Sequence, residues 1–306
     1  VLRVPYEELS ISSQEGRTRA VMKIQEGCDR YCAYCIIPHV RGGIRSRTPD
    51  MVRAEALRLV NAGYREIVLT GIHLTSYGKD LDGTGLLDAV RAAAVPGLPR
   101  LRLGSLEPVV ATDGFVKELA RIPTVCPQFH LSMQSGSDSV LKRMRRRYTA
   151  REFLEAAGRL KAAFPGCALT TDVLVGFPGE IEEEFEQTLA VCREAGFAKM
   201  HIFPFSRRAG TAADRMPGQL SRAVKTERAR RMAALDRQMA VAFREGMLGS
   251  TQPVLFETRD ADSLTRGQTM NGMQAAAPGG QEGQIQKVRL ESVSGEEFLG
   301  TLTAAD

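Results

Sequence analysis

The strongest constraint on the fold of this chain is a regular alternation of short apolar runs with helix-patterned segments. Strands that alternate with helices pair in parallel, because each helix carries the chain back along one face of the sheet. Six such units are fewer than the eight of a complete (β/α) barrel, so the pattern predicts either a partial barrel or an open doubly wound sheet. The six predicted strands are VMKIQE (21–26), EIVLTG (66–71), RLRLGS (100–105), QFHLSM (128–133), ALTTDVLVGF (168–177) and FAKMHIFPF (197–205).

Helices are predicted between these strands from apolar periodicity and end signals. The first covers 50–63, where Asp50 can serve as the N-cap and Gly63 can end the helix. The other predicted helices cover 86–94, 113–121, 138–147, 150–164 and 179–196, and one long helix covers 219–246.

The sequence changes character after the long helix. Short runs such as TQPVLFET and GQIQKVRLESV are separated by glycine-rich turns and lack a helical period. This pattern is typical of a small all-β domain, plausibly a little barrel. We therefore expect one large domain over 19–246, closed by the long helix, and a small β domain over 247–306.

Charge is distributed unevenly between these two parts. Residues 247–306 contain four basic and eight acidic side chains, a net charge of −4, so the overall +5 leaves +9 on residues 1–246. A polyanion would be attracted mainly to the larger part, although a solvated basic surface without a partner is the alternative. The chain has no apolar run long enough to span a bilayer and no signal segment at its start. We therefore expect no binding to membranes. Because Cys126, Cys167 and Cys192 are scattered singly, we also expect a reduced, cytoplasmic protein.

The other three cysteines, Cys28, Cys32 and Cys35, lie close together in GCDRYCAYC with the spacing C-x3-C-x2-C. Thiolates this close suit a soft metal centre, and three of them on a [4Fe–4S] cube leave one iron open to a non-protein ligand. An open position marks a reactive site rather than a structural one. A zinc site with His39 as the fourth ligand is the alternative, but structural zinc sites usually place their second pair of ligands well downstream.

CDRYCAYC resembles the signature of the radical S-adenosylmethionine (SAM) enzymes, C-x3-C-x-aromatic-C, with Tyr34 in the aromatic position. The resemblance implies that the three cysteines hold a [4Fe–4S] cluster and that SAM binds the open iron through its amino and carboxylate groups. Reductive cleavage of SAM would then yield a 5′-deoxyadenosyl radical. The cofactor carries this chemistry, while the protein orients it and protects it from quenching.

Further segments resemble the methylthiotransferases, which replace a C–H bond with a methylthio group. The resemblance implies a partial (β/α)6 radical SAM barrel over 19–246 and an RNA-binding, TRAM-like β domain over 247–306. It also implies an N-terminal domain that carries a second three-cysteine [4Fe–4S] cluster. Because the sequence starts at Val1, we expect that domain to be missing and residues 1–18 to be the linker from it. This chain alone would then cleave SAM without inserting sulfur. The similar segments are KIQEGCDRYCAYCIIPHVRGGIRSR, LTGIHLTSYG, RLGSLEP, FHLSMQSGSDSVLKRMRRRYT, TTDVLVGFPGE and FPFSRRAGTAA.

In such a barrel the active site lies at the carboxyl ends of the strands, and polar or glycine-rich segments follow each predicted strand there. Tyr34 is expected to lie against the adenine of SAM or to pack beneath the cysteine loop. His73 is a candidate to bind the substrate, and for each polar residue a structural hydrogen bond is the alternative. The candidates to bind SAM are Tyr34, Ser105, Glu107, Gln134, Ser135 and Asp172.

The densest basic segment is KRMRRR (142–147). Consecutive helical residues cannot all face one way, so part of it is expected to be solvated. The RNA substrate that the resemblance implies would give Arg146 and Arg147 a role as phosphate contacts. In the acidic β domain, Arg266 and Lys287 are the corresponding candidates.

The block LTGIHLTSYG resembles the methylthiotransferases of threonylcarbamoyladenosine. Our hypothesis is an enzyme that adds a methylthio group to C2 of N6-threonylcarbamoyladenosine next to the anticodon of tRNA. The alternatives are isopentenyl-adenosine in tRNA, an aspartate of a ribosomal protein, or a non-catalytic RNA-binding protein with zinc. We expect a monomer that binds tRNA and receives electrons from a donor such as flavodoxin or ferredoxin.

Overall fold

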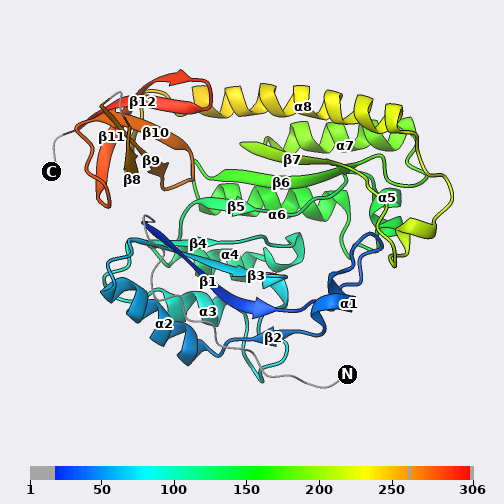
Figure 1. The fold of residues 1–306 in the computed structure, drawn as a ribbon, viewed down its shortest axis with the longest axis horizontal. Coiled ribbons are helices and arrows are strands. Elements are labelled where there is room, and N and C mark those ends of the chain that lie inside the picture. The colour runs from blue at the N-terminus through cyan, green and yellow to red at the C-terminus, as the bar shows by residue number, and fades with distance from the viewer. Residues whose placement is uncertain (1–17, 261–262, 304–306) are drawn as a thin grey trace.

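The computed structural model describes residues 18–260 and 263–303, and it places a strand in each of the six predicted segments (Figure 1). The predicted linker 1–18 lies outside the described residues except for Thr18. The short strand β2 (Arg45–Ser46), antiparallel to β1, was not predicted. The six strands are β1 (Arg19–Glu26), β3 (Glu66–Gly71), β4 (Arg100–Leu103), β5 (Gln128–His130), β6 (Ala168–Val175) and β7 (Lys199–Pro204).

These six strands follow one another in chain order around a curved, open sheet. Parallel pairing joins β1 to β3, β3 to β4, β5 to β6 and β6 to β7. Beyond the ends of β4 and β5, an isolated parallel bridge pairs Leu106 with Leu131, and the amide of Leu106 donates to His130 O at 2.8 Å. A doubly wound sheet would reverse its strand order partway. The partial barrel is therefore confirmed.

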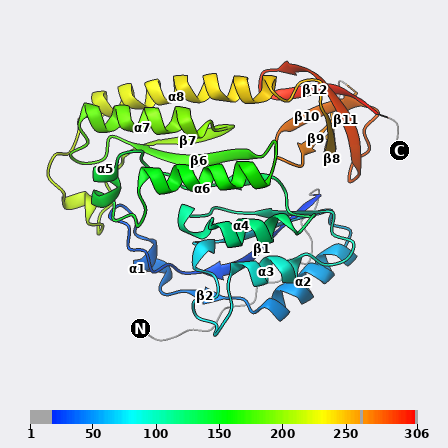
Figure 2. The ribbon, with the colours of Figure 1, turned by 180° about the vertical axis from the view of Figure 1, so that it is seen from behind.

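Helices cover the outer face of this sheet (Figures 1 and 2). Large apolar side chains such as Ile67, Leu101 and Phe129 are fully buried. Of the helices that the structure describes, none has the length and apolar character that crossing a membrane requires. The helices are α1 (Ile37–Arg41), α2 (Pro49–Asn61), α3 (Leu86–Ala93), α4 (Asp113–Ala120), α5 (Asp138–Arg143), α6 (Ala150–Ala163), α7 (Glu182–Ala195) and α8 (Arg222–Glu245), with 3₁₀ turns at Leu74–Ser76, Pro108–Val110 and Ala213–Arg215.

Several helix ends differ from the prediction, and α7 and α8 each begin three residues later than predicted. The N-cap of α2 is Thr48 rather than Asp50: its Oγ1 accepts from Met51 N, and Pro49 takes the first helical position. The helix predicted over 138–147 ends at Arg143.

The early end of α5 is a Schellman motif. The amide of Arg145 donates to Lys142 O at 3.0 Å and that of Arg146 to Leu141 O at 2.9 Å, while Arg145 has a φ of 60°. The sequence does not predict this left-handed turn, because glycine and not arginine is the usual residue there. The turn separates Arg146 from the exposed helical residues before it.

The C-terminal strands form the predicted small barrel. They close in the order β10-β12-β11-β8-β9 around buried side chains that include Val254, Phe256 and Phe298. The strands are β8 (Thr251–Arg259), β9 (Leu264–Thr269), β10 (Gln274–Pro278), β11 (Ile285–Ser294) and β12 (Glu297–Leu302).

The small barrel packs against the amino ends of the parallel strands, through a buried set of charges that we call the Glu66 network (Glu66, Arg100 and Arg102). Arg102 Nε lies 2.8 Å from Glu66 Oε1, and Arg100 Nη1 lies 3.7 Å from Glu66 Oε2. Arg100 also donates to the carbonyls of Gln268 at 2.8 Å and Pro253 at 2.5 Å, both in the small barrel. The carboxyl ends of the strands, where the cysteine loop lies, face the other way (Figure 1).

Candidate active site

The cysteine loop leaves the carboxyl end of β1 through a turn that requires glycine. Gly27 has a φ of 74°, and a Cβ there would lie 1.8 Å from Gly43 O. The amide of Cys28 then donates to Gly42 O at 3.1 Å. The loop thus returns close to its own start, and this closure brings the three cysteines together.

Backbone hydrogen bonds hold the middle of the loop in place. The amide of Ala33 donates to Met144 O at 3.0 Å, and Ala33 O accepts from the amide of Ala213 at 2.7 Å. Tyr34 meets Phe177 edge to face with 6.4 Å between ring centroids, within a separate apolar cluster beneath the loop. The loop is therefore anchored to the end of α5 and to the segment after β7.

The six cysteines fall into two groups. Cys126, Cys167 and Cys192 are buried in the core as predicted, and burial raises the pKa of their thiols to about 11, 11 and 12. Cys28, Cys32 and Cys35 are half-buried and line a cavity of about 150 Å³. The cavity is lined by Cys28, Arg30, Cys32, Tyr34, Cys35, Ile37, Ile72, His73, Ser105, Leu106, Glu107, Ser132, Gln134 and Arg146.

The spacing of these thiols argues against a single zinc ion. Among the described residues, the one set of three potential ligands with atoms all within 4.8 Å of one another is Cys28, Asp29 and His73. The three cysteine sulfurs do not form such a set, whereas two thiolates on one zinc ion lie no more than about 4.6 Å apart. His39, the proposed fourth ligand, is exposed and meets the ring of Tyr31 at 5.5 Å. A larger centre with several metal atoms suits three separated thiols better.

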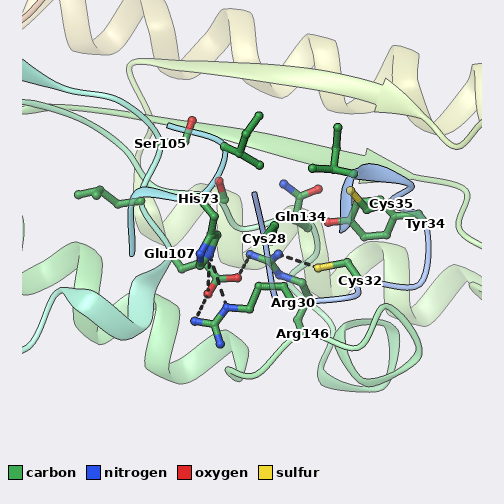
Figure 3. A pocket seen from close by; sticks show the side chains of 14 residues that line it. Cys28, Arg30, Cys32, Tyr34, Cys35, His73, Ser105, Glu107, Gln134 and Arg146 are labelled. Carbon is green, nitrogen blue, oxygen red and sulfur yellow. Dashed lines mark hydrogen bonds and ion pairs between the residues drawn. The ribbon is translucent and has the colours of Figure 1, made fainter. Parts of the chain in front are cut away.

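Beside the thiols lies a second buried set of charges, which we call the Glu107 network (Arg30, His73, Glu107 and Arg146; Figure 3). Glu107 Oε2 lies 2.7 Å from Arg30 Nη2 and 3.1 Å from His73 Nε2, and its Oε1 lies 2.9 Å from Arg146 Nη2. Burial alone would raise the pKa of Glu107, but the hydrogen bond from His73 and the charges of Arg146 and Arg30 lower it to about 2. The carboxylate is therefore ionised at neutral pH, and the two arginines outnumber it.

Most of the predicted site residues line this cavity. Three others lie near it without lining it. Ser135 is buried behind it, with its Oγ 3.2 Å from Thr188 Oγ1. Asp172 faces His130, with Oδ2 3.3 Å from Nε2. Arg147 is exposed and lines a neighbouring outer cleft. The predicted residues that do line the cavity are Cys28, Cys32, Tyr34, Cys35, His73, Ser105, Glu107, Gln134 and Arg146.

The candidates in the small barrel lie at the other edge of the strands. Arg266 is paired with Asp260 at 2.7 Å and with Glu297 at 3.2 Å. Lys287 is exposed on β11.

Sequence reasoning missed Arg30 and Ser132, together with the apolar lining residues Ile37, Ile72 and Leu106. Arg30 carried a usable signal, because a charged residue between two clustered cysteines must either face solvent or find a counter-charge. Its partner Glu107 follows a strand far along the chain. Nothing local to either residue predicts the pair.

The radical SAM superfamily model matches residues 22–192, a segment that contains the cysteine loop and five of the six parallel strands. The chain belongs to the radical SAM superfamily. Superfamily members use a [4Fe–4S] cluster and SAM, and the three separated thiols on a partly open cavity fit that cluster.

Curated relatives narrow the family. The chain is 41% identical to the threonylcarbamoyladenosine tRNA methylthiotransferase MtaB of Bacillus subtilis, covering 93% of this chain and 65% of that protein. It is 37% identical to MtaB of Thermotoga maritima, covering 97% and 68%. It is also 37% identical to the tRNA-2-methylthio-N(6)-dimethylallyladenosine synthase of Symbiobacterium thermophilum, covering 91% and 62%. The chain is thus a member of an MtaB-like radical SAM family and spans about two thirds of the length of these relatives.

Solved structures agree on the fold. The radical SAM methyltransferase TsrM from Kitasatospora setae matches with a TM-score of 0.53 at 19% identity, covering 64% of this chain and 38% of that one. Coproporphyrinogen III oxidase (HemN) from Escherichia coli matches with a TM-score of 0.52 at 14% identity, covering 85% and 66%. At such identities the likeness concerns the barrel and not the reaction.

Proposed function

We propose that this chain is the radical SAM part of a tRNA methylthiotransferase that adds a methylthio group to C2 of N6-threonylcarbamoyladenosine next to the anticodon. The observation that carries the proposal is the cavity at the carboxyl ends of the strands, where three half-buried thiols lie beside buried fixed charges. Its relatives include threonylcarbamoyladenosine tRNA methylthiotransferases. A structural metal site would need neither an adjoining cavity nor a buried excess of arginine.

In this proposal Cys28, Cys32 and Cys35 hold the cluster and leave one iron open for SAM. When bound, the cluster and SAM supply one-electron radical chemistry. Other polar side chains that line the same cavity are assigned to SAM. These are Tyr34, Ser105, Glu107 and Gln134.

Asp172 and Ser135 act on this cavity through Gln134. Gln134 has a φ of 64°, its amide donates to Asp172 O at 2.9 Å, and its carbonyl accepts from Leu174 N at 2.9 Å. An unusual backbone conformation held on both sides is typical of a residue whose side chain must point in one direction. We therefore assign Asp172, whose main chain pairs with Gln134, to positioning, and we assign Ser135, held by Thr188, to the support of the same turn.

Two side chains at the cavity, Arg30 and His73, favour threonylcarbamoyladenosine over the dimethylallyl nucleoside. A threonylcarbamoyl group carries a carboxylate and a hydroxyl that an arginine and a histidine can bind, whereas a dimethylallyl group is a hydrocarbon and offers them no polar contact. His73 and Arg30 are the lining residues we assign to that side chain. The percentages of identity alone do not separate the two nucleosides, because both kinds of relative match at similar levels.

The tRNA backbone is assigned to the outer cleft of about 410 Å³ next to the cavity, which Lys142 and Arg147 line. Phosphate contacts there would place the anticodon region near the thiols. In the small barrel, the candidates for further phosphate contacts are Arg266 and Lys287, of which Lys287 is the more exposed. We further propose that 19–246 and 247–306 are the two domains of a cytoplasmic monomer that takes electrons from a flavodoxin or ferredoxin.

Mass spectrometry of tRNA nucleosides from a deletion strain tests the substrate. The methylthiolated threonylcarbamoyl nucleoside should disappear, and the complete reading frame should restore it while the same frame with Cys28→Ala does not. Persistence of that nucleoside in the deletion strain would refute the proposal. Loss of the methylthiolated dimethylallyl nucleoside instead would support the alternative.

A further inference from the structure

Arg146 lies between the carboxylate of Glu107 and the sulfur of Cys32. Its side chain is 7% exposed, its Nη2 lies 2.9 Å from Glu107 Oε1, and its Nη1 donates to Cys32 Sγ at 3.3 Å. We propose that Arg146 is a positioning residue that holds a fixed positive charge against the Cys32 thiolate and thereby raises the reduction potential of the cluster. The inference rests on the assignment of the cluster to the three cysteines, and not on the tRNA substrate.

The local sequence builds this arrangement. The Schellman motif at the end of α5, with Arg145 at a φ of 60°, directs the chain so that Arg146 turns into the cavity. Arg146 Nε then donates to Tyr148 Oη at 2.9 Å, and its guanidinium carbon lies 4.9 Å from the centre of the Tyr148 ring. Tyr148 is itself held, because its hydroxyl donates to Ser132 O at 2.7 Å.

Each nitrogen of the guanidinium therefore has its own partner: Tyr148 for Nε, Cys32 for Nη1 and Glu107 for Nη2. A charge held by three groups in a largely buried site is fixed in place, even though Arg146 lines the outer cleft as well as the cavity. Its neighbour Arg147 is exposed on the outer cleft. We therefore assign the contact with sulfur to Arg146 and the contact with phosphate to Arg147.

The electrostatic consequence follows from charge balance. Reduction adds one electron from an external one-electron donor and no proton, so the net charge of the cluster with its thiolate ligands becomes more negative by one. A cation and a hydrogen bond donated to a ligand sulfur stabilise the more negative state more than the oxidised one. Glu107 opposes this effect, since its carboxylate is ionised 2.9 Å from the same guanidinium. Removing Arg146 should lower the potential, and neutralising Glu107 should raise it.

The test is a redox titration of the cluster-loaded 306-residue chain, followed by electron paramagnetic resonance with dithionite and mediators in the absence of SAM and RNA. At the potential where the wild type is half reduced, Arg146→Met should lower the ratio of reduced to oxidised cluster about tenfold, equivalent to about 59 mV for one electron. Arg146→Lys keeps the charge but cannot contact Tyr148, Cys32 and Glu107 together, so its shift should be smaller.

The matched control is Arg145→Met, which removes the same charge from an exposed side chain one residue away. It should leave the ratio unchanged, and a shift as large as that of Arg146→Met would overturn the proposal. An unchanged ratio in Arg146→Met would also overturn it.

If Arg146→Met takes up no cluster, Glu107→Gln decides the question, because it keeps Arg146 and must raise the ratio. A fall or no change in Glu107→Gln would count against the proposal, since simple damage to the site does not produce shifts of opposite sign. A wild-type chain that binds no iron would instead overturn the cluster assignment on which the inference rests.

Discussion

The parallel strands carry a buried glutamate between arginines at both of their edges, and the two sets have different surroundings. At the amino edge, Nη2 and Nη1 of Arg100 donate to backbone carbonyls of the small barrel at 2.5 and 2.8 Å. At the carboxyl edge, Nη1 of Arg146 donates to the sulfur of Cys32 beside the cavity. The Glu66 network is enclosed between two packed surfaces, whereas the Glu107 network borders a space that a ligand can enter.

This difference shows that residue type and burial alone do not separate a structural ion network from a functional one. A buried ion pair between packed surfaces holds those surfaces in register, and breaking it costs stability. A buried ion pair beside a cavity fixes charge where a cofactor or substrate arrives. What distinguishes the two cases is the partner of the arginine donors that do not contact the glutamate. In the Glu66 network these donors meet backbone carbonyls of a packed surface, and in the Glu107 network they meet a sulfur beside a cavity.

Removing one thiol near each edge should separate these two roles most strongly. Cys28→Ala should abolish SAM cleavage and most iron binding, because two thiolates cannot hold the cluster in its site. Cys126→Ala, in the core next to β5 near the Glu66 network, should keep its iron and lose only about 1 kcal/mol of stability. Iron content, visible absorbance and 5′-deoxyadenosine formation are the measurements. Full iron content in Cys28→Ala would contradict the cluster assignment.

Glycine substitutions at the two edges should have the next largest effects. Gly27→Ala forces a Cβ to 1.8 Å from Gly43 O at a φ of 74°, so the cysteine loop should open and iron binding should fall severely. Gly43→Ala is its control, because a Cβ there meets nothing within 4 Å.

At the other edge, Gly267→Ala would place a Cβ 2.0 Å from Leu255 O inside the small barrel. We expect it to lower the melting temperature while the remaining folded protein keeps its iron. If Gly27→Ala and Gly43→Ala bind equal amounts of iron, the closure of the loop is not what assembles the thiols.

Neutralising Glu66, the centre of the Glu66 network, should lower the free energy of unfolding without changing cluster binding. Glu66→Gln leaves Arg100 and Arg102 buried without a counter-charge, so the free energy of unfolding should fall by about 3 kcal/mol. Glu257→Gln breaks a more exposed pair with Arg19 in the same contact region and should cost about 1 kcal/mol or less. Urea unfolding measures both. Loss of cluster signal in folded Glu66→Gln would mean that the two edges are coupled.

The sequence was sufficient for features with a local signal. Apolar runs, glycines and cysteine spacing predict the six strands and the thiol loop, because each depends on residues close together in the chain. The same runs left a partial barrel and a doubly wound sheet both open, and the family resemblance favoured the barrel. The charge networks have no such signal: Glu107 meets Arg30 and Arg146 only after three distant segments fold together. The turn at Arg145 was also not predictable from the sequence, because an arginine does not indicate a left-handed conformation. That turn ends the helix early and sends Arg146 inward.

The smallest effect concerns the support beneath the cysteine loop, where Glu184 on α7 holds the end of α5. Its Oε2 lies 2.6 Å from Arg143 Nη2 and accepts from Ile181 N at 3.0 Å. Burial alone would raise the pKa of Glu184, but the hydrogen bonds from Arg143 and Ser139 lower it to about 2. A carboxylate with a lowered pKa stabilises the fold above its ordinary pKa, and that contribution is lost as the pH falls from about 4.5 to 2.

Glu184→Gln should therefore be less stable than the wild type at pH 6, by about 1 kcal/mol, and this difference should narrow as the pH falls toward 3. Urea midpoints of the iron-free chain at pH 6, 4 and 3 measure it, since acid would release iron from the loaded protein. Glu183→Gln, an exposed neighbour on the same helix, should leave the midpoint at pH 6 unchanged. A difference for Glu184→Gln that stays constant down to pH 3 would show that Glu184 supports the loop by packing rather than by charge, in contrast to both buried networks.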